Sequence, residues 1–210
     1  MQKTLHIIAQ AISILLYPLW IPTIGMILYC LGVSAVALPL PPFYWWISCG
    51  FTFFVTAVIP LSLILIGIKC GAITDVYIKT RQQRTTPYIH TIICYCFWIY
   101  FLIRTLHAPT FLWVTAIGAT ADLVLVTLIN LKWKISSHLS GLGGLLGGIF
   151  SFCLYYSVMP GIALMSVFLL TTLLLMYSRI YLQAHDGWQV VAGFILALLC
   201  TFIPNLCLFS

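Results

Sequence analysis

A polar segment, SRIYLQAHDGWQ at positions 178–189, separates the last two long apolar runs of the chain. Ionisable side chains at the boundary of a membrane span are costly to keep, so they indicate a functional site more often than packing. If a helix begins near Ala184, His185 and Gln189 share one face of it, and the amide oxygen can orient the imidazole. The alternative is an interfacial turn with a snorkelling Arg179 and an ordinary histidine.

The whole chain has the composition of a membrane protein. Of its 210 residues, 63% are hydrophobic and only 6% are charged, whereas a soluble domain has about 25% charged residues. A membrane-spanning helix needs about 20 apolar residues. We therefore expect an all-α, multi-pass helical bundle in which residues 1–210 form a single domain. Its seven predicted spans lie at about 7–31, 43–68, 88–105, 110–131, 139–158, 162–177 and 190–208.

Two of these spans contain residues that shape helices. Pro18 and Pro22 predict a kink in the first span. In the fifth span, Gly141, Gly144 and Gly148 are spaced by three and four residues. This spacing predicts a groove of small residues for close approach of another helix.

The cysteines and acidic residues argue against metal or disulfide chemistry. The eight cysteines are scattered through apolar runs without a Cys-x-x-Cys pair, so they are expected to be small hydrophobic residues. The only acids are Asp75, Asp122 and Asp186, too few to build a site of hard oxygen ligands for Mg²⁺ or Ca²⁺. We therefore expect chemistry without a metal or another cofactor.

The formal charge of +6 arises from basic residues in short loops, not from a separate domain. The expected partners are therefore membrane lipids and lipid phosphates, and nucleic acid is not expected. The sequence gives no indication of oligomeric state.

Three polar loops follow the second, fourth and sixth predicted spans. Because successive spans cross the membrane in opposite directions, all three loops lie on one face and can form a single site. The first loop carries Lys79, Arg81 and Arg84, the second Ser136, Ser137 and His138, and the third Arg179 and His185.

Each loop also has a plain structural interpretation. A basic loop can mark the cytoplasmic side, and serines before a helix can be ordinary caps. Together, however, arginine forks and a helix N-terminus bind phosphate oxygens. Two imidazoles can act as nucleophile and general acid. The combination predicts phosphoryl transfer through a phosphohistidine, with cations stabilising the equatorial oxygens.

At these residues the chain resembles the type 2 phosphatidic acid phosphatases, which share their fold and site with the vanadium haloperoxidases. The first motif of that family is Lys, six residues, then Arg-Pro; here Lys79 precedes Thr86-Pro87 at that spacing. The second, Pro-Ser-Gly-His, is matched at Ser136 and His138.

The third family motif is Ser-Arg, five residues, His, three residues, Asp. Ser178, Arg179 and His185 match it in identity and spacing, and Gln189 stands where the aspartate would be. The resemblance covers residues 79–189. It implies a six-helix core, with the first span at 7–31 as a candidate accessory helix, and hydrolysis of a phosphate monoester or diphosphate of a lipid.

The resemblance also implies roles for individual residues. His185 would be the nucleophile, oriented by Gln189, and His138 the general acid. The phosphate would be bound by Lys79 and Arg179, close to Ser137. We expect the neighbouring polar residues to contribute to phosphate binding as well: Ser136, Arg81 and Arg84.

The two departures from the family pattern have chemical consequences. An aspartate at position 189 would stabilise positive charge on the nucleophilic imidazole, whereas Gln189 offers only a neutral hydrogen bond, so slower turnover is expected. Thr86 removes one phosphate-binding arginine, for which Arg81 or Arg84 can substitute. One alternative is therefore a relative that binds lipid phosphates without hydrolysing them. Which lipid phosphate is the substrate stays open.

A second alternative is a membrane transporter, which would be expected to have buried charges within its spans. Only Asp122 and Arg104 qualify. The distribution of lysine and arginine also predicts an orientation, because these residues favour the cytoplasmic side. We expect a bacterial inner-membrane protein with its site on the cytoplasmic face. Arg104 lies on the opposite face, and the site face carries Lys3, Lys69, Lys79, Arg81, Arg84, Lys132, Lys134 and Arg179.

Overall fold

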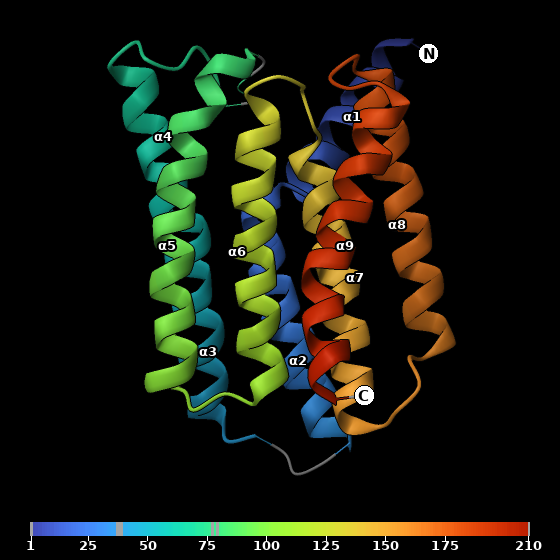
Figure 1. Cartoon of the computed structure of the whole chain (residues 1–210). Helices are drawn as coiled ribbons and strands as arrows, with labels where there is room; N and C mark the ends of the chain where they lie inside the picture. Colours follow the sequence, from blue (N-terminus) through green and yellow to red (C-terminus); the bar gives the residue numbers. More distant parts are fainter. Residues whose placement is uncertain (1, 37–39, 77, 79, 210) are drawn as a thin grey trace.

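The structure, a computed structural model, describes residues 2–36, 40–76, 78 and 80–209. Within these residues, seven helical segments are long and apolar enough to cross a membrane, so the predicted all-α, multi-pass bundle is confirmed. Figure 1 shows the helices packed side by side. They are α1 (Gln2–Leu15), α2 (Ile21–Val36), α3 (Pro42–Phe53), α4 (Ile59–Lys69), α5 (Thr85–Arg104), α6 (Thr110–Asn130), α7 (Ser137–Tyr156), α8 (Ile162–Tyr181) and α9 (Gly187–Phe209).

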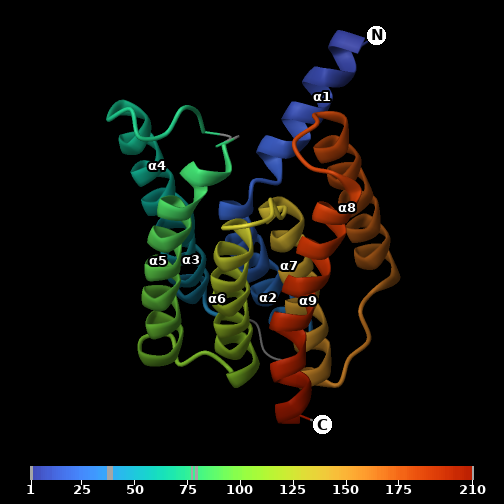
Figure 2. The same ribbon diagram turned by 45° about the horizontal axis from the view of Figure 1, so that its top comes forward.

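Prolines interrupt the first two spans. The first span is divided rather than simply kinked, because Pro18 has no N–H with which to continue the helix. A 3-10 turn over Pro18–Trp20 separates α1 from α2. α1 tilts away from α2 and packs against α8 (Figure 2). In the second span, a π-helical turn over Phe54–Val58 joins α3 to α4 just before Pro60.

α7 and α9 form a close helix pair at the centre of the bundle. A Cβ atom at Gly143 would overlap the carbonyl oxygen of Phe194, and one at Gly147 would overlap the hydroxyl of Thr201. These two glycines therefore allow the backbones to approach. The glycines predicted to form a groove, Gly141, Gly144 and Gly148, make less close contacts with three different helices. A Cβ atom at these positions would lie 3.0 Å from Ile21 of α2, 3.6 Å from Thr201 of α9 and 3.3 Å from Thr115 of α6. All three glycines also line a cavity described below.

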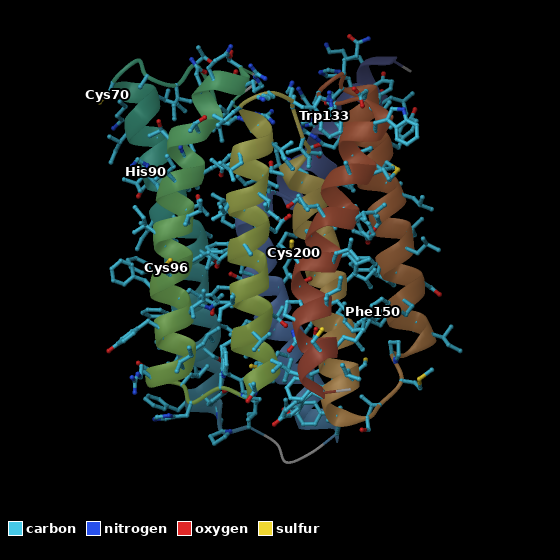
Figure 3. The ribbon with its side chains drawn as sticks, in the orientation of Figure 1. Cys70, His90, Cys96, Trp133, Phe150 and Cys200 are labelled. Atoms are coloured by element: carbon cyan, nitrogen blue, oxygen red, sulfur yellow. The ribbon has the colours of Figure 1, made fainter. Side chains whose placement is uncertain are left out.

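The three polar loops gather at one end of the bundle, as predicted. Figure 1 shows the α4–α5, α6–α7 and α8–α9 connections at the upper end, together with the N-terminus, and the C-terminus at the lower end. Cys70 and Trp133, which belong to two of these loops, are both labelled near the upper end in Figure 3. The loops that follow the second, fourth and sixth spans can therefore contribute to one site.

Candidate functional site

A cavity of about 60 Å³ lies where these connections meet. We call it the polar cavity because two arginines and a histidine are part of its otherwise mainly apolar wall. A buried water needs about 10–15 Å³ of such space, so the cavity has room for an anion with a few oxygens. All three polar loops and the break in the first span contribute to its lining. The lining includes Tyr17, Pro18, Arg84, Pro87, Tyr88, Thr91, Ser137, His138 and Arg179.

Arg84 is the cation that the first loop brings to the polar cavity. It ends a 3-10 turn over Arg81–Arg84 that leads into α5, and its side chain is only 5% exposed. Its Nε donates a hydrogen bond to the carbonyl oxygen of Ile78 (2.9 Å). Its Nη1 is buried and has no hydrogen-bond partner in the described part of the chain. A buried guanidinium with an unused donor beside a cavity indicates an anion site.

The other predicted residues of this loop are placed differently. Of the two arginines, Arg84 lines the polar cavity, whereas Arg81 does not belong to the described lining. Arg81 instead accepts a hydrogen bond from Nδ2 of Asn130 at its backbone carbonyl (3.0 Å). Thr86 is exposed, while Pro87 lines the cavity. Lys79 lies outside the described residues.

Arg179 is the cation from the third loop, and it is 4% exposed. It lies in the last turn of α8 and lines the polar cavity. The chain then turns back on itself: Gln183 adopts a positive φ of 50°, and the N–H groups of Ala184 and His185 donate to the carbonyl oxygen of Arg179 (3.1 and 3.4 Å). This helix-ending turn holds His185 beside Arg179.

The second loop contributes the N-terminus of α7. Ser137 and His138 form its first turn and line the polar cavity. Ser136 occupies the capping position, but its side chain does not cap the helix, and its buried Oγ has no partner among the described residues. The backbone N–H of Ser136 donates to the carbonyl oxygen of Gln189 (3.2 Å), which ties this loop to α9. N–H groups in the first turn of a helix favour anions.

His138 is buried against the break in the first span. Its Nε2 donates to the carbonyl oxygen of Ser13 (3.2 Å), and its ring meets that of Tyr17 edge-on with centroids 5.4 Å apart. The carbonyl of Ser13 needs a partner from elsewhere because α1 ends at Leu15. The first span, a candidate accessory helix, thus supplies part of the surroundings of His138.

His185 lies in the turn between α8 and α9 and is 6% exposed. The predicted helix start near Ala184 was wrong, since α9 begins at Gly187, but the predicted contact is present. Nδ1 of His185 donates to Oε1 of Gln189 (2.9 Å), which leaves the lone pair of Nε2 for another partner. Burial, followed by the charges of Arg84 and Arg179, lowers the pKa of His185 to about 3. The imidazole is therefore neutral near pH 7.

Gln189 has a second role at the start of α9. Its backbone N–H donates to Oδ1 of Asp186 (2.9 Å), and its Oε1 also accepts the backbone N–H of Asp186 (3.4 Å). These reciprocal bonds form a capping box. The amide that orients His185 is thus fixed by the helix terminus itself.

Electrostatic interactions connect the members of the site. His138 lies within electrostatic range of Arg179, His185 and Arg84. Burial and the same two arginines lower the pKa of Lys134, in the loop before α7. The sequence interpretation missed Lys134, Ser13 and Tyr17. For Ser13 and Tyr17 the available signal was Pro18, because a broken helix leaves carbonyl groups that need donors.

A larger apolar chamber adjoins the polar cavity. It has a volume of about 510 Å³, within the range of about 300–1,000 Å³ typical of ligand sites. Its lining runs along α2 and α7 to Val158–Gly161 in the α7–α8 loop, at the opposite end of the bundle. The two spaces share Pro18, Leu19, Tyr88, Thr91 and Ser137 in their linings.

The arrangement can thus hold an anion next to Arg84, Arg179 and His138, with an apolar chain in the adjoining chamber. His185 is not part of the described lining of the polar cavity but lies within electrostatic range of both arginines. No cluster of three or more His, Cys, Asp or Glu side chains suited to a metal ion occurs within the described ranges. No family model, curated protein or solved structure matches the chain. Its function is therefore argued from the geometry and chemistry of this site.

Proposed function

We propose that the protein is a metal-independent membrane phosphatase that hydrolyses a phosphate monoester or diphosphate of a lipid. The observation that carries this proposal is the meeting of three separate segments around one polar cavity: Arg84, Ser137–His138 and Arg179, with His185 beside the arginines. The adjoining apolar chamber supports a lipid substrate, because a chain attached to a phosphate in the polar cavity can extend into it. The motif spacing and the resemblance to the type 2 phosphatidic acid phosphatases agree with this function.

In the proposed first step, Nε2 of His185 attacks phosphorus. Its lone pair is available because Nδ1 carries the proton that is donated to Gln189. The P–N bond forms as the bond from phosphorus to the lipid oxygen breaks, and His138, which enters this step as an imidazolium, gives a proton to the leaving oxygen and becomes neutral. Arg84, Arg179 and the N-terminus of α7 stabilise the negative charge on the phosphoryl oxygens.

The second step releases the phosphate. Water attacks phosphorus, His138 takes up the proton of that water, and the P–N bond breaks to free inorganic phosphate and His185. In the structure the N–H of His138 is used by the carbonyl of Ser13. The imidazolium form carries a second proton on Nδ1, which can be transferred while Nε2 stays bonded to Ser13.

The test is phosphate release by the purified protein in detergent with a chelator present. Candidate substrates are phosphatidic acid, phosphatidylglycerol phosphate and a prenyl diphosphate. We expect release from at least one of them, a loss of about 10³-fold or more in His185→Ala, and little change in His6→Ala, which alters an exposed histidine of α1. Absence of release by the parent protein from every lipid phosphate would refute the enzyme.

The second candidate function is a protein that binds lipid phosphates without hydrolysis. Two observations favour it: Gln189 carries no charge to stabilise an imidazolium, and His138 already has a backbone partner. In the same experiment this candidate predicts no phosphate release but a rise in melting temperature with lipid phosphate, which Arg84→Met would reduce.

The proposal includes a location, the cytoplasmic face of a bacterial inner membrane. Its support is the excess of lysine and arginine at the site end of the bundle. Among the described lysines and arginines, only Arg104, in the last turn of α5, lies at the other end (Figure 1). Labelling of Cys70 in intact and in permeabilised cells by a reagent that cannot cross membranes would test the orientation, because Cys70 is exposed at the site end.

A further inference from the structure

The carboxyl group of Asp122 lies in the wall of the apolar chamber. Asp122 belongs to α6 and is 6% exposed. Its Oδ2 accepts a hydrogen bond from the hydroxyl of Ser140 on α7 (2.5 Å). Its Oδ1 is buried and has no hydrogen-bond partner among the described residues. Because buried polar atoms are nearly always paired, an unused acceptor in the wall of a chamber indicates a missing donor.

The position of this carboxyl suggests where the donor comes from. Ser140 lies three residues after Ser137, which lines both the polar cavity and the chamber. Three residues of helix correspond to a rise of about 4.5 Å. The carboxyl of Asp122 therefore lies about one turn from the polar cavity, at the depth of the first few lipid atoms behind a bound phosphate.

The lining of the chamber offers this carboxyl no positive charge. Neither lysine nor arginine occurs among the described residues that line it. A carboxylate is expensive in apolar surroundings unless it is paired. A donor on the ligand, and above all a charged one, would supply what the protein does not.

We infer that Asp122 and Ser140 form a recognition site for a hydrogen-bond donor of the lipid, either a hydroxyl or an ammonium group a few bonds from phosphorus. The inference rests on the proposed function, because it assumes that the phosphate occupies the polar cavity. A lysophosphatidic acid provides such a donor as a hydroxyl, and a sphingoid phosphate provides an ammonium group as well. A simple alkyl phosphate has no such donor. The site therefore selects for lipid phosphates that carry one.

The experiment compares kcat/KM for lysophosphatidic acid, sphingosine phosphate and hexadecyl phosphate in detergent. We expect the parent protein to prefer the two donor-bearing lipids by about tenfold or more. Asp122→Asn keeps an oxygen acceptor but removes the charge, so the preference for the ammonium lipid should fall most. Asp122→Leu should abolish both preferences, so that the kcat/KM values of the three lipids become equal. Cys153→Ala, elsewhere in the chamber wall, should change neither preference.

Equal kcat/KM values for the three lipids in the parent, or an unchanged preference in folded Asp122→Leu, would overturn the inference. If the parent hydrolyses none of the lipids, the proposed enzyme fails, and the subsite is judged by binding. A rise in melting temperature that is larger for the donor-bearing lipids, and equal for all three in Asp122→Leu, would then support it. Equal rises in the parent would refute it.

Discussion

Nδ1 of His185 donates to Oε1 of Gln189 over 2.9 Å, and this amide belongs to the capping box that starts α9. The orientation of the imidazole is therefore coupled to a helix terminus. A neutral acceptor fixes which nitrogen carries the proton, but it does little to stabilise a positive ring.

A negative charge at position 189 should make His185 a stronger nucleophile. Glutamate can replace glutamine in a capping box, so Gln189→Glu keeps the start of α9. Its carboxylate would raise the pKa of His185 above the present value of about 3. We expect kcat to rise by about tenfold, measured as phosphate release near pH 7. In contrast, Gln189→Met removes the acceptor and should lower kcat by a similar factor; the opposite order for the two variants would contradict this role.

Arg84 and Arg81 form a matched pair of residues. Substituting each in turn tests which one compensates for the phosphate-binding arginine that Thr86 replaces. Arg84 lines the polar cavity with an unused buried donor, whereas the contact made by Arg81 uses its backbone carbonyl. Arg84→Met should lower kcat/KM by about 10–100-fold, the usual cost of a charge-assisted contact. Arg81→Met should change it by less than about threefold. Comparable losses in both variants would show that the loop contributes only general positive charge.

The low pKa of His185 predicts a pH dependence of stability. An ordinary histidine titrates near 6.5, so between about pH 6.5 and pH 3 the unfolded chain binds a proton that the folded protein does not. Stability must then fall as the pH falls through this range, by at most about 5 kcal/mol in total. Melting temperatures of the parent and His185→Gln, measured from pH 8 to pH 4, should converge or cross as the pH falls. Parallel curves would mean that His185 has an ordinary pKa.

Binding of phosphate should raise the pKa of His185 part of the way back toward its ordinary value. Its negative charge would offset those of Arg84 and Arg179, which help to lower the pKa of His185. Nitrogen chemical shifts of the histidine ring, titrated with and without inorganic phosphate, should show a higher pKa in the phosphate-bound protein. An identical titration at saturating phosphate would place the anion elsewhere.

The fold was predictable from the sequence because membrane spans are set by length and hydrophobicity, and both are local properties. The side on which each polar loop lies followed from counting spans. Features that depend on packing between helices were not predictable. The spacing of the glycines in α7 fits two faces of the helix. Only the structure shows that Gly143 and Gly147 allow the closest approach of α9, whereas Gly144 makes ordinary contacts with α9 and also lines the chamber.

The candidate site was predictable where spacing along the chain determines contacts. His185 reaches Gln189 because a tight turn and a capping box fix both residues. The contact of His138 with Ser13 joins residues 125 positions apart. It depends on where α1 breaks and how it tilts, which no local pattern encodes. The choice between Arg81 and Arg84 likewise depended on the 3-10 turn that precedes α5.

Gly193 offers a way to move the two histidines apart without changing either. A Cβ atom at Gly193 would lie only 2.5 Å from the carbonyl oxygen of Ser136, the residue that is also bonded to the backbone of Gln189. Gly193→Ala must therefore push the start of α7, with His138, away from α9. Because misplacement by about 1 Å can cost about 10²-fold in rate, we expect kcat to fall by about that factor. Gly50→Ala is the control: a Cβ atom at Gly50 would meet nothing within 4 Å, and Gly50 lines neither the polar cavity nor the chamber, so activity should stay within about twofold. Melting temperatures measured in parallel separate a local shift from unfolding. If folded Gly193→Ala keeps full activity, the alignment of α7 and α9 does not control the chemistry.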